Sequence, residues 1–162
     1  PVSSKFAIQS NMTLSTNKNE ETIVSRNGAF VNLGKTDISF SPDIVASNAF
    51  VYQPMPSFQM SLLSKFVGDQ FMSNTEAELS RLDSYFTTDF NVSYTIEPKS
   101  IFDSIVITGL VNNIFNEEYI NNGYYFTFDD DFSNPGTIAT IEGAGFYPQA
   151  TANFLLGVKL NF

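Results

Sequence analysis

The last twelve residues, 151–162, constrain the fold of this chain more than any other segment. Their side chains alternate between apolar and polar with a period of two, which places successive residues on opposite faces of a β-strand. The apolar face runs to the carboxy-terminal residue and is formed by Phe154, Leu156, Val158, Leu160 and Phe162. The other face is polar apart from Leu155. We therefore expect a terminal strand with one face in apolar surroundings and the other in water.

The composition favours strands and excludes several kinds of chemistry. The chain has 17 Phe, 7 Tyr and no Trp, and aromatic residues are enriched in strands. It has no Cys and no His, which excludes disulfides, thiol nucleophiles, imidazole bases and nearly all zinc sites. A net charge of −9 without a basic run argues against nucleic acid as a partner. We expect no catalytic residues, no cofactor and no metal site, and hence a protein that is not an enzyme.

The hydropathy pattern excludes a transmembrane helix but permits transmembrane strands. No stretch reaches the roughly 18 apolar residues that a spanning helix needs. Spanning strands need only about 9 to 11 residues with alternating faces, which averaged hydropathy does not detect. The chain opens on Pro1 without a signal peptide, and we interpret it as a piece of a longer exported precursor.

Five further segments show strand patterns. They are residues 4–16, 44–53, 58–71, 82–97 and 102–115. The facing of 44–53 is ambiguous, whereas the other four have a clear apolar face. These faces comprise Phe6, Ile8, Met12 and Leu14; Phe58, Met60, Leu62 and Phe66; Phe86, Phe90, Val92, Tyr94 and Ile96; and Ile105, Ile107, Val111 and Phe115. The polar faces include Asn91, Ser93, Asn153 and Asn161.

The connections between these strands alternate in length. Residues 53–57 and 97–100 form tight, proline-containing turns, whereas 17–42, 70–81 and 116–149 are long, polar loops. Outer-membrane barrels have short periplasmic turns and longer extracellular loops. The pattern predicts an all-β, antiparallel up-and-down meander of about six strands, with Phe162 and both tight turns on the periplasmic side.

Two motifs resemble elements of a known family. Residues 111–119 and 122–124 resemble the N-L-F-[ND]-x-x-Y element near the end of TonB-dependent outer-membrane receptors, Bacteroidetes-type members in particular. Residues 146–150 with Asn153 and Phe154 resemble the Y-P-x-x-G-R-x-F element that opens the final strand. Upstream, residues 41–48 and 65–71 resemble the corresponding barrel segments. Where many members have Gly-Arg, this chain has Thr151, Ala152 and Asn153, so no arginine contact is carried over.

The resemblance implies that residues 1–162 are the carboxy-terminal segment of a transmembrane 22-stranded β-barrel whose plug domain is absent from this chain. Such a receptor lies in the bacterial outer membrane and takes up a metal complex, such as an iron siderophore or haem, or another bulky ligand. Its implied partners are the lipid bilayer, the plug and remaining strands of the parent receptor, the TonB complex, the outer-membrane assembly machinery and the ligand. No bond of the ligand is altered during transport.

The resemblance and the composition of the loops also suggest functional residues. The terminal-strand residues Phe154, Leu156, Val158, Leu160 and Phe162 resemble the signal that the assembly machinery recognises. In the long loop, Tyr119, Tyr124, Tyr125 and Tyr147 are candidates for extracellular ligand contacts. The neighbouring acids 129–131 lack the spacing of a calcium loop, and residues 143–145 are interpreted as loop punctuation.

Two alternatives belong to other classes. A soluble β-sandwich that binds a ligand predicts a dry core between two stacked sheets. A small self-contained outer-membrane barrel predicts at least two further strands or the association of two chains.

Overall fold

The computed structural model describes residues 3–98 and 101–162 as an all-β protein with one short 3-10 helix, η1 (Glu78–Ser80). Six strands form the main sheet: β1 (Phe6–Leu14), β4 (Ile44–Met55), β5 (Phe58–Val67), β8 (Tyr85–Ile96), β9 (Ser104–Asn112) and β12 (Asn153–Asn161). They pair in that order, and every pair is antiparallel. The predicted meander of six strands is therefore confirmed.

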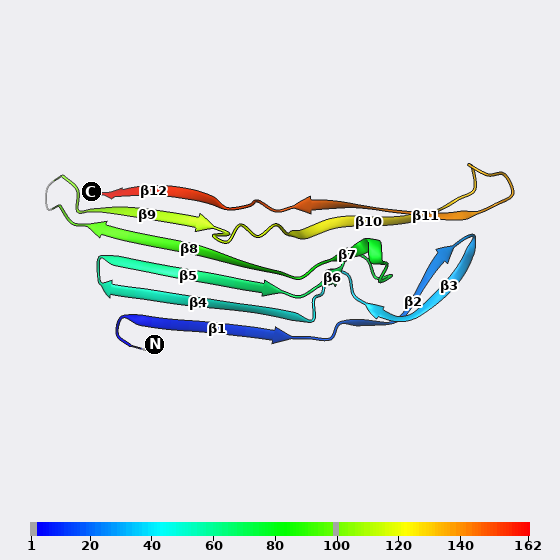
Figure 1. Ribbon diagram of the computed structural model, residues 1–162, viewed down its shortest axis with the longest axis horizontal. Coiled ribbons are helices and arrows are strands. Elements are labelled where there is room, and N and C mark those ends of the chain that lie inside the picture. Colours follow the sequence, from blue (N-terminus) through cyan, green and yellow to red (C-terminus); the bar gives the residue numbers. More distant parts are fainter. Residues whose placement is uncertain (1–2, 99–100) are drawn as a thin grey trace.

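The sheet is open within the part of the chain that the structure describes. Its edges are β1 and β12, which lie on opposite sides of the sheet in Figure 1. The turn between β4 and β5, the end of β8, the start of β9 and the carboxy terminus lie together at one end of the strands, and the long connections lie at the other. Residues 99–100 of the predicted turn 97–100 lie outside the described residues. The predicted asymmetry of the two ends is confirmed, and the assignment of one end to the periplasm stays a prediction.

The long connections are hairpins rather than loops, so the prediction of irregular loops was wrong. Residues 17–42 contain β2 (Lys18–Arg26) and β3 (Ala29–Asp37), and residues 116–149 contain β10 (Ile120–Asp130) and β11 (Ala139–Pro148). The third connection contains β6 (Gln70–Phe71), η1 and β7 (Arg81–Leu82). The β2–β3 turn is Asn27-Gly28, with φ of 52° and 77°, the left-handed backbone that a two-residue hairpin turn favours.

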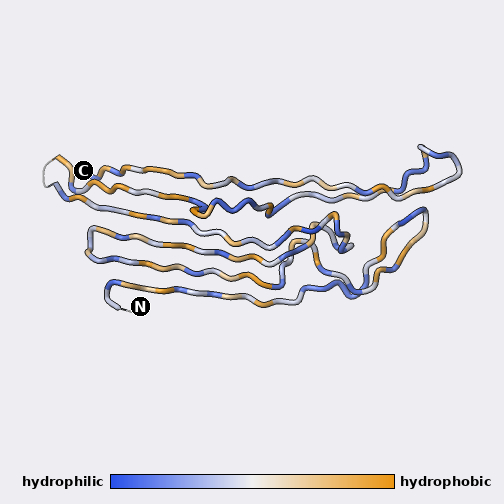
Figure 2. Tube along the Cα trace, in the orientation of Figure 1, coloured by the Kyte–Doolittle hydropathy of each residue, from blue (hydrophilic) through white to orange (hydrophobic). Residues whose placement is uncertain are grey.

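The register resolves the two faces of the main sheet. Figure 2 shows hydrophobic and hydrophilic residues alternating along its strands. The pairing places the predicted apolar-face residues on one common face, except Phe115, which lies beyond β9, and Phe162, which lies beyond β12. It also settles the strand with ambiguous facing, because Phe50 pairs with Ile8 and Leu62, and Tyr52 pairs with Phe6 and Met60. The predicted polar residues Asn91, Ser93, Asn153 and Asn161 share the opposite face.

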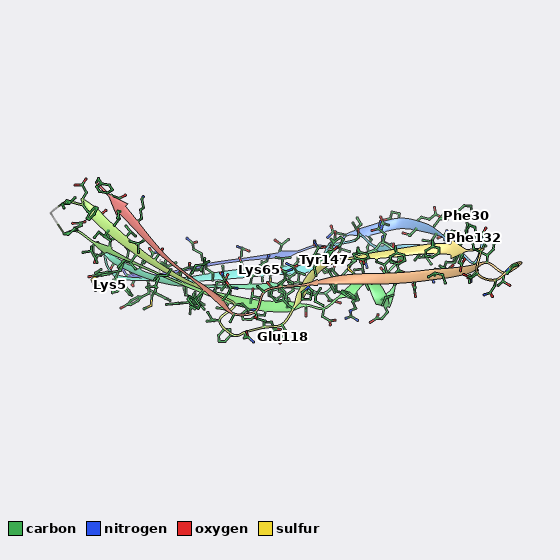
Figure 3. All side chains as sticks on the ribbon, turned by 90° about the horizontal axis from the view of Figure 1, so that it is seen from above. Lys5, Phe30, Lys65, Glu118, Phe132 and Tyr147 are labelled. Carbon is green, nitrogen blue, oxygen red and sulfur yellow. The ribbon has the colours of Figure 1, made fainter. Side chains whose placement is uncertain are left out.

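The main sheet has no apolar core on either face. The four buried apolar side chains of the described residues are Val67, Met72, Leu82 and Tyr85, all near the hairpin end. Viewed from above, the molecule is a thin layer with side chains on both sides, with Lys5 near one end and Phe30 and Phe132, in the hairpins, near the other (Figure 3). Among the residues described, no second sheet stacks on the first, so the dry core that a β-sandwich predicts is not found.

Candidate functional site

The apolar face of the main sheet is uncovered. On the edge strand β12, the exposed fractions are 80% for Phe154, 76% for Leu156, 63% for Val158 and 45% for Leu160. Phe162 follows the strand and packs against Phe102, with 4.9 Å between ring centroids. The residues assigned to an assembly signal therefore lie on an accessible edge, and no part of the described chain encloses them.

Four polar side chains cross this apolar face in one row, and they are hydrogen-bonded in pairs. Ser10 Oγ donates to Asn48 Oδ1 at 2.5 Å, and the hydroxyls of Ser64 and Thr88 lie 3.0 Å apart. Burying a polar group in apolar surroundings is costly unless it has a partner. The pairing lowers the cost of covering this face with an apolar medium.

The apolar residues on the common face of the six strands form a band across the sheet. This apolar band is slanted relative to the inter-strand hydrogen bonds, which run perpendicular to the strands. The pairing links Phe154 through Val111, Phe90, Leu62 and Phe50 to Ile8, so these residues lie at one level. On β12 the band runs from Phe154 only toward the tight turns, as far as Phe162, and its midpoint is Val158. On β1 the band runs from Phe6 to Leu14, and its midpoint is Ser10.

These two midpoints differ by six residues. On β12, Val158 lies four residues from Phe154 toward the tight turns. On β1, Ser10 lies two residues from Ile8 toward the hairpins, and Ile8 and Phe154 lie at the same level of the register. On β4 the midpoint, Asn48, lies level with Ser10, and on β5, β8 and β9 the midpoint moves toward the level of Val158. With about 3.3 Å per residue and about 4.8 Å between strands, six residues across five strand spacings correspond to a slant of about 40°.

The opposite face is polar and holds two grooves. The larger, of about 640 Å³, is lined by polar side chains such as Gln59, Ser61 and Asn91 and also by the leucines Leu63, Leu110 and Leu155. The smaller, of about 350 Å³, lies nearer β1. The lining of the larger groove is mostly uncharged, which suits a surface that is wetted or bound reversibly by another polar surface.

The motif at residues 111–119 ties the end of β9 to the start of β12. Asn113 is 4% exposed, and its Nδ2 donates to the carbonyls of Glu117 at 2.8 Å and Ala150 at 3.4 Å. Its Oδ1 accepts from the Glu117 N–H at 2.9 Å. Asn116 Oδ1 accepts from the Ala152 N–H at 3.0 Å. Both asparagines have positive φ, which their short polar side chains tolerate. The motif is thus a structural junction.

The four candidate tyrosines do not form one pocket. Tyr119 stacks on Tyr85 with 4.4 Å between ring centroids, and burial raises the pKa of Tyr119. Tyr125 donates its hydroxyl to Glu142 at 2.5 Å on one face of the β10–β11 hairpin. Tyr124 and Tyr147 lie together on the other face, 6.2 Å apart. The structure brings two of the four together and separates the other two.

The rings of Tyr124 and Phe126 explain why residues 143 and 145 are glycines. Gly143 and Gly145 lie within β11, so their interpretation as loop punctuation was wrong. A Cβ added at Gly145 would lie 2.5 Å from Cζ of Tyr124, and one added at Gly143 would lie 2.6 Å from Cζ of Phe126. The glycines therefore leave room for rings that lean across from β10, an arrangement that protects glycine in a strand.

A carboxylate joins the two large hairpins, which the sequence did not reveal. Asp129 accepts hydrogen bonds from the hydroxyls of Ser25 at 2.6 Å and Thr140 at 2.7 Å, and from the Gly28 N–H at 3.0 Å. These hydrogen bonds, that from Ser25 above all, lower the pKa of Asp129. The Asn27-Gly28 turn is thereby docked on β10–β11. Among the described residues, no group of three or more acidic side chains is placed to hold a metal ion.

Comparisons of the chain with models of protein families, with curated proteins and with solved structures found no match. Within residues 3–98 and 101–162, no helix is long and apolar enough to cross a membrane.

Proposed function

We propose that the main sheet is part of the wall of a transmembrane β-barrel, in a TonB-dependent receptor of the bacterial outer membrane. The slanted apolar band is the observation on which the proposal rests. Strands of outer-membrane barrels tilt by about 35–45° from the barrel axis. The lipid layer is perpendicular to that axis, so the residues that face lipid must form a band at the same angle to the lines of paired residues. A slant of about 40° lies within this range.

Three further features support the proposal. One face is apolar and exposed, and its polar residues are paired in a row. The other face is polar and grooved, as expected for a lumen that contains water or a plug. Both edges of the sheet are open, so the edge strands are free to pair with further strands of a closed barrel.

In this proposal, the receptor takes up a metal complex such as an iron siderophore or haem and moves it by energy from the TonB complex. The six strands keep every backbone amide paired in hydrocarbon and present the polar face to the plug. The exposed apolar residues of β12 would be recognised by the assembly machinery. The hairpins would form part of the extracellular mouth.

Labelling along β12 tests the proposal, because the chain has no cysteine of its own. Single cysteines from position 153 to 160 are labelled with an environment-sensitive fluorophore in the full chain, reconstituted with lipid vesicles. Quenchers attached to lipid chains should act at Phe154, Leu156, Val158 and Leu160, and a water-soluble quencher at the alternate positions. Equal quenching on both faces would contradict the proposal. The mass of the solubilised particle distinguishes a small barrel made from two copies.

A further inference from the structure

One face of the β10–β11 hairpin displays a row of near-parallel aromatic rings. Tyr124 and Phe126 are 6.4 Å apart with an interplanar angle of 18°, and Phe126 and Phe128 are 6.3 Å apart at 13°. Tyr147 adjoins this row from β11. All four side chains are about half exposed. We call these four residues the aromatic row.

The end of the molecule that carries the aromatic row is strongly acidic. The connections 15–43, 68–84 and 113–152 together contain four basic and fourteen acidic residues, a net charge of −10, whereas the rest of the chain has a net charge of +1. The connection that holds the aromatic row has no Lys, Arg or His at all. Asp130 follows Phe128 on the same face of β10, opposite the small residue Ala139. An anionic ligand would be repelled here, and a cationic one attracted.

We propose that the aromatic row binds the arginine side chains of a basic peptide. A guanidinium group is planar, weakly hydrated and always charged, and it stacks on aromatic faces while pairing with carboxylates. The near-parallel rings supply the stacking contact. Asp130 supplies the carboxylate, although its Oδ1 already accepts hydrogen bonds from the N–H groups of Phe132 and Ser133. A lysine ammonium is compact and strongly hydrated and gains less from a ring face. A neutral sugar would make no use of the charge. The inference depends only on the hairpin, and it goes beyond the proposed transport role.

The test measures binding of a six-residue arginine peptide to the full chain in a non-ionic detergent, by titration calorimetry at physiological salt. The matched probes are the six-residue lysine and glutamate peptides and a neutral maltohexaose. We expect the arginine peptide to bind more tightly than the lysine peptide, and the glutamate peptide and the sugar not to bind.

Phe126→Leu removes one ring face but keeps an apolar cover over Gly143, and Phe30→Leu is the matched control at an exposed phenylalanine elsewhere on the hairpins. Phe126→Leu should weaken arginine-peptide binding by roughly two- to five-fold, the scale of an exposed cation–π contact, and Phe30→Leu should not change it. Equal affinity for the arginine and lysine peptides, binding of the sugar alone, or no binding would each overturn the inference. Because the assay needs no bilayer, its failure leaves the labelling test of the membrane face unaffected.

Discussion

Asn113 offers the sharpest test of how the motif at residues 111–119 works. Asn113→Ala removes two donated hydrogen bonds and one accepted bond at a site that is 4% exposed. Together the three bonds, of which the one to Ala150 is long at 3.4 Å, contribute about 2–3 kcal/mol. Alanine at a φ of 51° adds about 1 kcal/mol more. We expect a loss of about 3–4 kcal/mol in the free energy of unfolding.

The assay is urea unfolding of the full chain in detergent, followed by tyrosine fluorescence. With a slope of about 2 kcal/mol per M, the midpoint should fall by about 1.5–2 M. Asn112→Ala is the control, because that neighbour makes only an exposed hydrogen bond to Asn153, and its effect should stay below about 1 kcal/mol. Amide exchange at Glu117 should accelerate only in Asn113→Ala. If the two variants lose equal stability, the junction does not work as described.

The remaining predictions concern the hairpin contact and the apolar face. The pKa of Asp129 is lowered in the folded chain, so its contribution is complete above its usual pKa near 3.8 and is lost as pH falls through the folded value. Amide exchange at Gly28 should therefore rise in acid, and Asp129→Asn should weaken the pH dependence; an unchanged profile would contradict this role. Val158→Arg, at the midpoint of the band, should cost about 2–4 kcal/mol of stability in lipid, and Leu155→Arg on the polar face much less; equal losses in lipid-vesicle unfolding would refute the facing. In the proposed receptor, deleting Phe162 should lower the outer-membrane level, measured by blotting of membrane fractions, more than the ligand affinity; equal membrane levels would count against the proposed assembly role.

The main sheet could be predicted because apolar and polar residues alternate along its strands. The facing of β4 could not, because Asn48 interrupts its apolar side and Ala49 and Val51 occupy its polar side. Only pairing with β1 and β5 decides it. The slant of the band also needs the register, since no strand by itself reveals its level relative to its neighbours.

The β2–β3 and β10–β11 hairpins were not predicted, and the reason is different. Residues 18–26 are mostly polar and lack alternation, because both faces of β2 are largely wet. The Asn27-Gly28 pair was the available sign of a turn. The separation of Tyr124 from Tyr125 follows once residues 120–130 are known to be a strand, and the contact between Asp129 and the distant turn at residues 27–28 is a tertiary contact that no local pattern specifies.

The depth of four labelled positions in a bilayer tests the account most directly. Ser10 and Val158 are the midpoints of the band on the two edge strands, and labels there should lie at the same depth, near the bilayer centre. Ile8 and Phe154 lie at one level of the register, yet labels there should differ in depth by about 15 Å, given strands tilted by about 40°. Equal depths for Ile8 and Phe154, with Ser10 and Val158 at different depths, would contradict the tilted barrel wall.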